Sequence, residues 1–270
     1  MYASHFGFQT PPFSITSDPS FLFFSQKHRE AYDSLIYGIE HRSGFIEITG
    51  EVGCGKTTLC RKALQELPKS VKTAYIFNTS VTEIQFLQTL LSDLGLPVEG
   101  KNRHTLFQDL NRFLIQALAK GDNVALFIDE AQNLPVKLLE MVRMLSNLET
   151  DRDKLIQIIL VGQPELRDLL ARNDLRQLRQ RISIRCHLGP LTLEETSHYI
   201  HHRLQVAGTG RKDLFPPDAV ESIWKHSRGI PRVINILCDK ALLAVYAAGR
   251  RQADSACLNQ CIQELEGAPS

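Results

Sequence analysis

Short apolar runs alternate with amphipathic stretches over the first two thirds of the chain. The runs that predict strands are residues 45–49, 73–77, 124–128, 155–161 and 182–188. Helical periodicity is expected from Ser25 onward, near 82–94 and 104–119, and again after Pro135. Such alternation indicates a parallel sheet covered by helices, the α/β fold class.

The last third of the chain shows helical periodicity only. The predicted helices are residues 192–206, 217–227, 231–248 and 255–265. Thr192 and Glu195 have the spacing of a capping box, which favours a helix start at that point. About the first 25 residues are rich in Phe and Pro, which predicts a packed, extended linker without a helix.

Composition excludes several classes of protein. The formal net charge is +1, so no global field draws the molecule to nucleic acid or to an anionic membrane. The six cysteines form no C-x-x-C pair, which favours a reducing compartment over a zinc or disulfide scaffold. The longest uncharged apolar run, residues 241–249, is too short to span a bilayer, and no integral membrane segment is expected.

The segment after the first predicted strand fits the phosphate-loop pattern G-x-x-x-x-G-K-[ST]. The expected nucleotide-binding residues are Gly50, Glu51, Val52, Gly53, Cys54, Gly55, Lys56, Thr57 and Thr58. Backbone N–H groups of such a loop surround a phosphate, and Lys56 would reach the β and γ oxygens of ATP. The Thr57 hydroxyl would ligate Mg²⁺. The rival interpretation is a chance Gly-rich turn.

Two acids follow the buried run 124–128. In a parallel sheet the carboxyl end of this strand would lie at the ligand crevice. Asp129 would hold Mg²⁺ through water, and Glu130 would orient and polarise the attacking water as a general base. Two acids at a strand end can also form a solvated turn. The presence of a phosphate loop in the same chain favours the interpretation that they bind metal and activate water.

Gln163 follows the strand expected at 155–161. It would lie beside the predicted acids at the same edge of the sheet and could sense the γ-phosphate of ATP. The alternative is that its amide caps the helix beginning at Pro164.

Six arginines lie within nineteen residues, at positions 167, 172, 176, 179, 181 and 185. One guanidinium could act as an arginine finger, supplied to the nucleotide of a neighbouring subunit. Arg181 is favoured over Arg179. A solvated helix face, or a basic stripe that binds nucleic acid, would also contain this many arginines.

Gly229-Ile230-Pro231-Arg232 opens the long helix near the end of the chain. Pro231 suits a first helical position, and Arg232 would face the γ-phosphate if the terminal helices fold over the cleft. Cations in a first helical turn are disfavoured by the helix dipole, which argues for a nearby anion. The expected organisation is a linker and first helix over 1–43, a nucleotide-binding core over 44–189 and a helical lid over 190–270. Glu47 interrupts a strand, and the sequence explains no role for it.

The ordered set of motifs resembles the AAA+ ATPases, with Gln163 at the first sensor position, Arg181 at the finger and Arg232 at the second sensor. Several segments narrow the resemblance to the ExeA or general secretion pathway protein A group, which includes the pilus-biogenesis ATPase MshM. These segments are Phe6-Gly7-Phe8, Pro12-Phe13-Ser14, His28-Arg29-Glu30-Ala31, Asp129-Glu130-Ala131-Gln132-Asn133-Leu134 and Gly162-Gln163-Pro164-Glu165-Leu166. The resemblance covers nearly the whole chain.

The resemblance implies a protein that hydrolyses ATP with Mg²⁺ and assembles with copies of itself into a ring or partial ring. It also implies a role in assembly of a secretion or type IV pilus apparatus, with an inner-membrane or cytosolic component of that machine as partner. The expected location is the cytoplasm, with peripheral attachment to the inner membrane as an option. Because the chain stops soon after Leu265, the MshM-like short form is expected, without a transmembrane helix or peptidoglycan-binding domain.

Two rival functions stay open at this point. DNA-associated AAA+ regulators of the TnsC/TniB kind share the core motifs, which would make DNA the partner. A nucleotide-regulated switch that hydrolyses slowly would use the same residues, with closure of the lid through Arg232.

Overall fold

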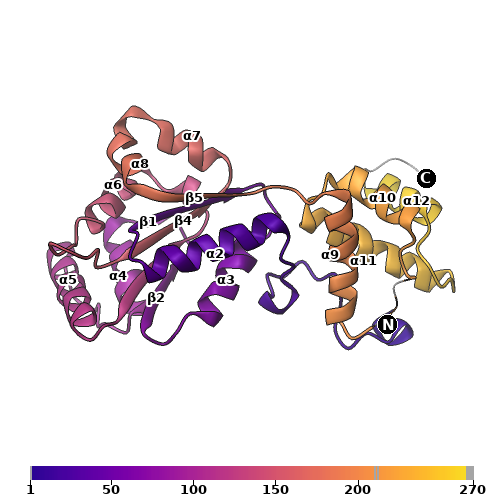
Figure 1. The fold of residues 1–270 in the computed structure, drawn as a ribbon, viewed down its shortest axis with the longest axis horizontal. Coiled ribbons are helices and arrows are strands. Elements are labelled where there is room, and N and C mark those ends of the chain that lie inside the picture. The colour runs from indigo at the N-terminus through magenta and orange to yellow at the C-terminus, as the bar shows by residue number, and fades with distance from the viewer. Residues whose placement is uncertain (1, 210, 212, 266–270) are drawn as a thin grey trace. The chain divides into compact units, whose positions relative to one another are not determined.

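The computed structural model describes residues 2–209, 211 and 213–265. Contacts group the chain into two compact units (Figure 1). The sheet unit comprises residues 27–50 and 59–188, and the helical unit comprises residues 1–26, 51–58 and 189–270. This grouping differs from the three consecutive ranges expected from the sequence, because the N-terminal aromatic segment packs among the C-terminal helices.

The sheet unit is built on five parallel strands. They are β1 (Phe45–Gly50), β2 (Val71–Ile76), β3 (Asn123–Ile128), β4 (Gln157–Gly162) and β5 (Ile182–Leu188). Their order in the sheet is β2-β3-β4-β1-β5, and every pairing is parallel. All five strands were predicted, with ends displaced by at most two residues, and the α/β fold class is confirmed.

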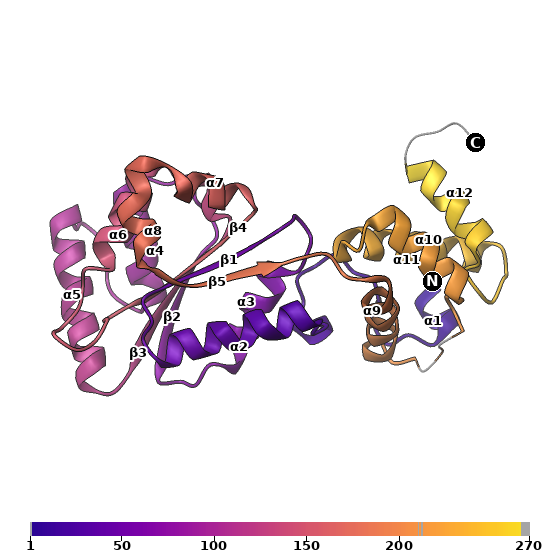
Figure 2. The same ribbon diagram turned by 45° about the horizontal axis from the view of Figure 1, so that its top comes forward.

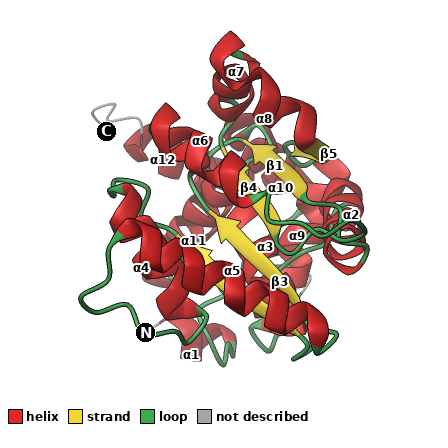
Figure 3. Ribbon diagram, turned by 90° about the vertical axis from the view of Figure 1, so that its left-hand side faces the viewer, coloured by secondary structure: helices red, strands yellow, loops and turns green. Residues whose placement is uncertain are grey.

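Helices cover both faces of this sheet (Figure 3). They are α2 (Gln26–Glu40), α3 (Lys56–Glu66), α4 (Glu83–Asp93), α5 (Arg103–Ala119), α6 (Val136–Leu145), α7 (Glu165–Ala171) and α8 (Arg176–Arg181), with short 3₁₀ turns η2 (Ala131–Asn133) and η3 (Asn173–Leu175). Figure 2 shows α2 and α3 on one face and α5 to α8 on the other. Right-handed crossovers produce this division, because the chain moves outward from β1 to β2 and then returns strand by strand.

The larger core of the sheet unit lies under helices α4 to α8. Leu126, Ile128 and Leu160 are fully buried there, as expected for strands covered on both faces. On the opposite face α2 approaches closely at Gly38, where a Cβ would overlap the side chain of Ile46. Tight packing on both faces gives β1, β3 and β4 a rigid position from which their terminal loops project.

The helical unit contains α1 (Tyr2–Phe6), η1 (Pro19–Phe21), α9 (Leu193–Val206), α10 (Pro217–Ser227), α11 (Pro231–Ala247) and α12 (Ser255–Leu265). The capping box of Thr192 and Glu195 is present with both of its hydrogen bonds. The prediction of an N-terminal segment without a helix was wrong, because the prolines begin only at Pro11 and leave the preceding residues able to form α1. No helix among the described residues reaches the length and hydropathy of a membrane span.

Arg203 connects the N-terminal segment to the C-terminal helices through hydrogen bonds and a cation–π contact. The residue is 5% exposed, and its guanidinium donates hydrogen bonds to the carbonyls of Pro12 (2.5 Å) and Ser14 (3.1 Å) and lies 4.6 Å from the ring centroid of Phe21. A buried charge is tolerated only where polar groups replace its hydration. The carbonyls of the linker therefore complete the core of the helical unit, and the linker is part of that core.

We expect Phe13→Ala to lower the free energy of unfolding of the helical unit by about 3–4 kcal/mol, because a fully buried ring leaves a cavity. Phe13 is 1% exposed and packs edge-on against Phe215, with centroids 5.8 Å apart. Urea titration followed by fluorescence of Trp224, the one tryptophan of the chain, reports on this unit. Ile15→Ala, at a site 58% exposed, is the matched control. Equal effects of the two changes would contradict the packing role.

Candidate functional site

The loops that carry the predicted nucleotide-site residues all begin at the carboxyl ends of the parallel strands. β3, β4 and β1 are neighbours, and their carboxyl ends lead into Asp129, Gln163 and the phosphate loop. The order of connections reverses beside β1, since the chain goes outward to β2 and later passes over β1 to reach β5. Ligands of open α/β sheets bind at such a switch point, outside the carboxyl ends of the strands.

Asp129 is held rigidly at the end of β3. The residue is 4% exposed, and its two carboxylate oxygens accept hydrogen bonds from the Tyr75 hydroxyl at 2.7 Å and from the Glu130 backbone N–H at 2.9 Å. Burial and the charge of Asp129 raise the pKa of Tyr75, so its hydroxyl remains protonated and donates. Sequence reasoning gave Tyr75 no role, because its contact joins two strands that are distant in the sequence.

Glu130 is fixed by two amides. Its Oε2 accepts hydrogen bonds from Nε2 of Gln132 at 2.6 Å and from Nε2 of Gln163 at 3.0 Å. Oε1 of Gln132 in turn accepts the backbone N–H of Gln163 at 3.0 Å, across Gly162, where a Cβ would lie 2.8 Å from that oxygen. The backbone of Glu130 is left-handed, with φ 50° and ψ 38°, a strained conformation for a residue with a side chain.

This network excludes one of the two interpretations of Gln163, and the role of the amide as a γ-phosphate sensor stays a prediction. Helix α7 has no side-chain cap at its start, so capping by the Gln163 amide was wrong. The amide instead reaches across from β4 to the acid after β3. Sequence reasoning assigned no role to Gln132, because the 3₁₀ turn η2 and the contact with Gln163 appear only in the folded chain.

The phosphate loop has the curled backbone that its glycines allow. Gly53 has φ 81°, and the Cys54 N–H bonds the Glu51 carbonyl at 3.2 Å to close a turn. Lys56 begins helix α3, is 5% exposed, and donates from Nζ to the same carbonyl at 3.0 Å. Burial raises the pKa of the Cys54 thiol, which therefore stays neutral beside the lysine. Cys54 is thus a packing residue of the loop.

Arg232 lies directly on this loop within the helical unit. Its backbone N–H donates to the Gly53 carbonyl at 3.1 Å, and a Cβ at position 53 would overlap the Cβ of Arg232. The adjacent Gly229 accepts a hydrogen bond from the Leu191 N–H at 2.9 Å, where the terminal helices begin. Through these bonds the start of α11 and the phosphate loop form one packed structure.

Arg181 lies at the amino ends of the strands, whereas the acids Asp129 and Glu130 lie at the carboxyl ends. It immediately precedes β5, whose first residue Ile182 pairs with Phe45 at the start of β1. Its guanidinium is partly buried and donates to Oγ of Ser146 at 2.8 Å. Since β1 is six residues long, its two ends are separated by about 17 Å, beyond the reach of one arginine side chain. Arg181 and the acids of its own chain are therefore not brought together.

Glu47 organises part of the arginine cluster. The carboxylate is 2% exposed in the middle of β1 and forms ion pairs with Arg167 at 3.4 Å and Arg185 at 3.2 Å. Arg172 pairs with Asp174 at 2.8 Å. Three of the six arginines thus form ion pairs with two acids of the chain, which weakens the interpretation of the cluster as a nucleic-acid stripe. Arg179 is exposed and bonds a backbone carbonyl at 3.4 Å.

The residues present suit a magnesium nucleotide. Carboxylate and hydroxyl oxygens are the ligands that Mg²⁺ takes together with phosphate oxygens; the sheet unit offers the carboxylate of Asp129, and the phosphate loop offers the hydroxyl of Thr57. The loop provides backbone N–H groups, the ammonium of Lys56 and the start of α3, all of which favour a polyphosphate. A P-loop at β1 with an acidic pair after β3 defines the class of P-loop nucleotide-binding proteins.

Comparison with known proteins gives the same class. A family model described as an AAA domain matches residues 39–170. The ORC2 protein of Aeropyrum pernix, solved as ADPNP and ADP complexes, superposes with a TM-score of 0.68 at 18% identity, over 91% of this chain and 68% of that chain. The RuvB Holliday junction branch migration motor of Thermotoga maritima gives 0.57 at 18% identity, over 88% and 68% of the two chains. These structures share the fold of this chain.

A sequence relative is more specific. General secretion pathway protein A of Aeromonas hydrophila is 42% identical over 268 residues, which cover 99% of this chain and 49% of the relative. The chain therefore spans about half the length of that protein. It is an AAA+ P-loop protein related to general secretion pathway protein A.

Proposed function

We propose that this protein hydrolyses ATP with Mg²⁺ at the carboxyl edge of its sheet. The observation that carries the proposal is the placement of Glu130, a carboxylate oriented by two amides directly after the buried Asp129. In this scheme the loop from Gly50 to Thr58 and the Lys56 ammonium bind the phosphates, and Thr57 and Asp129 hold Mg²⁺. Glu130 then accepts a proton from the attacking water.

Gln163 and Arg232 would report the state of the γ-phosphate. Gln163 bonds Glu130 directly, so an interaction of its amide with the γ-phosphate would change the orientation of the base. Arg232 is exposed and its backbone lies on the phosphate loop, which favours a role in communicating nucleotide binding to the terminal helices. The roles proposed for Gln163 and Arg232 predict that the protein changes conformation with the bound nucleotide. A nucleotide-regulated switch that hydrolyses slowly predicts the same.

We further propose that Arg181 acts on the nucleotide of a neighbouring copy. Its place at the amino edge of the sheet prevents it from serving the chain's own acids, and its bond to Ser146 holds the guanidinium at that edge. A fixed guanidinium that stabilises charge on the transferring phosphoryl group is the usual function of a finger in trans. Hydrolysis would then require a homo-oligomer, a ring or partial ring.

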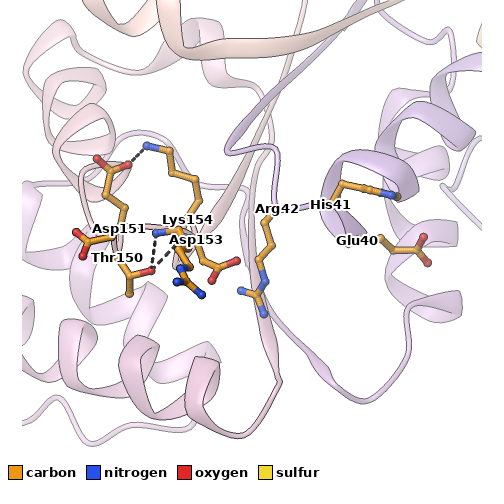
Figure 4. Close-up of a pocket in the computed structure, with 9 residues that line it drawn as sticks. Glu40, His41, Arg42, Thr150, Asp151, Asp153 and Lys154 are labelled. Atoms are coloured by element: carbon orange, nitrogen blue, oxygen red, sulfur yellow. Dashed lines mark hydrogen bonds and ion pairs between the residues drawn. The ribbon is translucent and has the colours of Figure 1, made fainter.

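A polar hollow of about 730 Å³ lies on the same edge of the sheet unit (Figure 4). Its lining joins the end of α2 and Arg42 to the loop of residues 149–154, where Lys154 pairs with Glu149. Burial, followed by the charge of Arg181, lowers the pKa of Lys154, so Arg181 acts electrostatically on this loop. Charges of both signs at this edge support a polar, salt-sensitive contact between copies.

The relative supports the cellular role that we propose, in which the ATPase drives or regulates assembly of a secretion or type IV pilus apparatus. Its partner would be an inner-membrane or cytosolic component of that machine, which would place the protein in the cytoplasm or at the inner membrane. The likeness to RuvB and ORC2 is one of fold only, at 18% identity. DNA regulation of the TnsC/TniB kind is the alternative that an experiment has to separate.

The test is ATP hydrolysis measured against protein concentration for the wild type, Arg181→Ala and Arg179→Ala, with molar mass determined in ATP and in ADP. We expect specific activity to rise with concentration, Arg181→Ala to lose at least about 100-fold in turnover, and Arg179→Ala to stay within about threefold. Activity independent of concentration, with Arg181→Ala unimpaired, would contradict the trans site. Strong stimulation by duplex DNA that disappears as salt is raised would favour the DNA-associated alternative.

We expect Tyr75→Phe to raise the Mg²⁺ concentration that supports half-maximal hydrolysis by about tenfold, as loss of an outer-shell hydrogen bond to a metal ligand commonly does. The change removes the donor to Asp129 and keeps the ring that packs on Phe127. Tyr37→Phe, at a site 56% exposed, is the control. An unchanged Mg²⁺ dependence would show that Tyr75 does not position the metal ligand.

A further inference from the structure

The helical unit carries a groove that the proposed ATPase does not use. It lies between the first half of α9 and the start of α10 and has a volume of about 900 Å³, which is large enough to take side chains of a partner. Phe215, Pro216 and Val220 contribute apolar surface to its floor, and Leu193 stands at the groove with 40% of its surface exposed. An exposed leucine beside an apolar floor is typical of a surface that buries a partner's side chain.

The rim of this groove is acidic. Four carboxylates line it, those of Glu194, Asp213, Asp218 and Glu221, and none of the described lysines or arginines belongs to the lining. Asp213 pairs with Arg211 at 2.9 Å and Glu221 pairs with Lys225 at 2.5 Å, both partners lying outside the lining.

The other two rim acids have no such partner. Within the described residues, Glu194 and Asp218 form no ion pair, and Asp218 accepts a hydrogen bond from Ser255, which lowers its pKa. Among the described residues of the lining, His201 is the one titratable base. The rim thus keeps an excess of negative charge around an apolar floor.

We propose that this groove binds a short segment of a partner polypeptide that inserts one or two large apolar side chains and places lysine or arginine against the rim. The charge selects this occupant, because phosphate groups of nucleotides, nucleic acids and anionic lipids are repelled by the carboxylates of Glu194 and Asp218, which form no ion pair within the described residues. The apolar floor supplies affinity and the rim supplies specificity and association rate. Binding here is independent of the nucleotide site, so it stands whether or not the chain hydrolyses ATP.

The test uses the 270-residue chain and three fluorescein-labelled peptides of about ten residues, a length that spans a groove of this size in extended form. The first peptide contains phenylalanine and leucine between lysines and arginines. The second replaces the basic residues by glutamate, and the third replaces the apolar residues by serine. We expect the first to bind with a Kd of about 10–100 μM in fluorescence anisotropy, and the other two at least about tenfold more weakly.

Variants locate the binding. Leu193→Ser should weaken the first peptide about five- to tenfold through lost apolar contact, and Glu194→Gln about two- to fivefold at low salt. Leu243→Ser, 53% exposed on α11, and Glu264→Gln on α12 lie outside the groove and should change nothing.

Three results would overturn the proposal. Equal binding to all four variants would show adhesion elsewhere on the surface. Binding of the third peptide as tight as that of the first would show a purely ionic contact. If Leu193→Ser alters only the molar mass of the protein and leaves peptide binding intact, the groove is a contact between copies of this chain.

Discussion

Glu130→Gln is expected to lower ATP turnover by about 100- to 1,000-fold, the usual contribution of a positioned general base, while ATP affinity stays within about threefold of the wild type. The glutamine side chain keeps the size of the glutamate and can still accept hydrogen bonds from Gln132 and Gln163 through its oxygen. It cannot take up the proton of the attacking water. Phosphate release under saturating ATP and equilibrium nucleotide binding separate the two effects.

Glu99→Gln is the control for this change, since Glu99 is an exposed loop residue remote in sequence from every proposed site residue. It should leave turnover and affinity unchanged. If Glu130→Gln retained more than about one third of wild-type turnover, the base would have to be another group. A loss of ATP affinity together with turnover would instead indicate a collapsed acidic turn, and the left-handed backbone at this position makes a check of thermal stability necessary.

Lys56→Ala is expected to weaken ATP binding by about 100-fold, because the ammonium that would pair with the β and γ phosphates is removed. The lysine is buried and its donor already points into the curled loop, toward the Glu51 carbonyl. Isothermal titration with a non-hydrolysable ATP analogue measures the change directly. Lys120→Ala, at the exposed end of α5, is the matched control.

A nucleotide affinity of Lys56→Ala equal to that of the wild type would mean that the loop does not bind the phosphates. Loss of affinity with an unchanged unfolding transition is the outcome that supports the site. The phosphate loop also contacts the start of α11 through Gly53 and Arg232, so the unfolding transition of the helical unit should be followed in the same samples.

The sheet and its principal loops were accessible from the sequence because their signals are local. An apolar run such as 124–128 predicts a strand, and the G-x-x-x-x-G-K-[ST] spacing predicts a phosphate loop without any knowledge of tertiary contacts. Four of the five predicted strands flank segments with assigned chemistry, and the parallel order of the sheet brings three of these segments to one edge. The α/β class followed from the same alternation.

The features that could not be predicted depend on contacts between distant segments. Gln132 matters because it meets Gln163, thirty-one residues later in the chain. Glu47 is explained by two arginines that only folding places beside β1. The N-terminal segment joins the terminal helices through Arg203, a contact across 191 residues to Pro12 that composition cannot reveal. Helix α1 was missed because the prolines that follow it dominated the local pattern.

Hydrolysis of ATP at a site completed by a second copy of the chain is the principal proposal for this protein. It is tested most directly by mixing two inactive variants, Lys56→Ala, which keeps Arg181, and Arg181→Ala, which keeps the phosphate loop and Glu130. We expect each variant alone to be inactive and an equimolar mixture to recover ATP hydrolysis, because the arginine of one copy completes the site of the other. A mixture as inactive as its components, although mass measurement shows that the two variants assemble together, would contradict it.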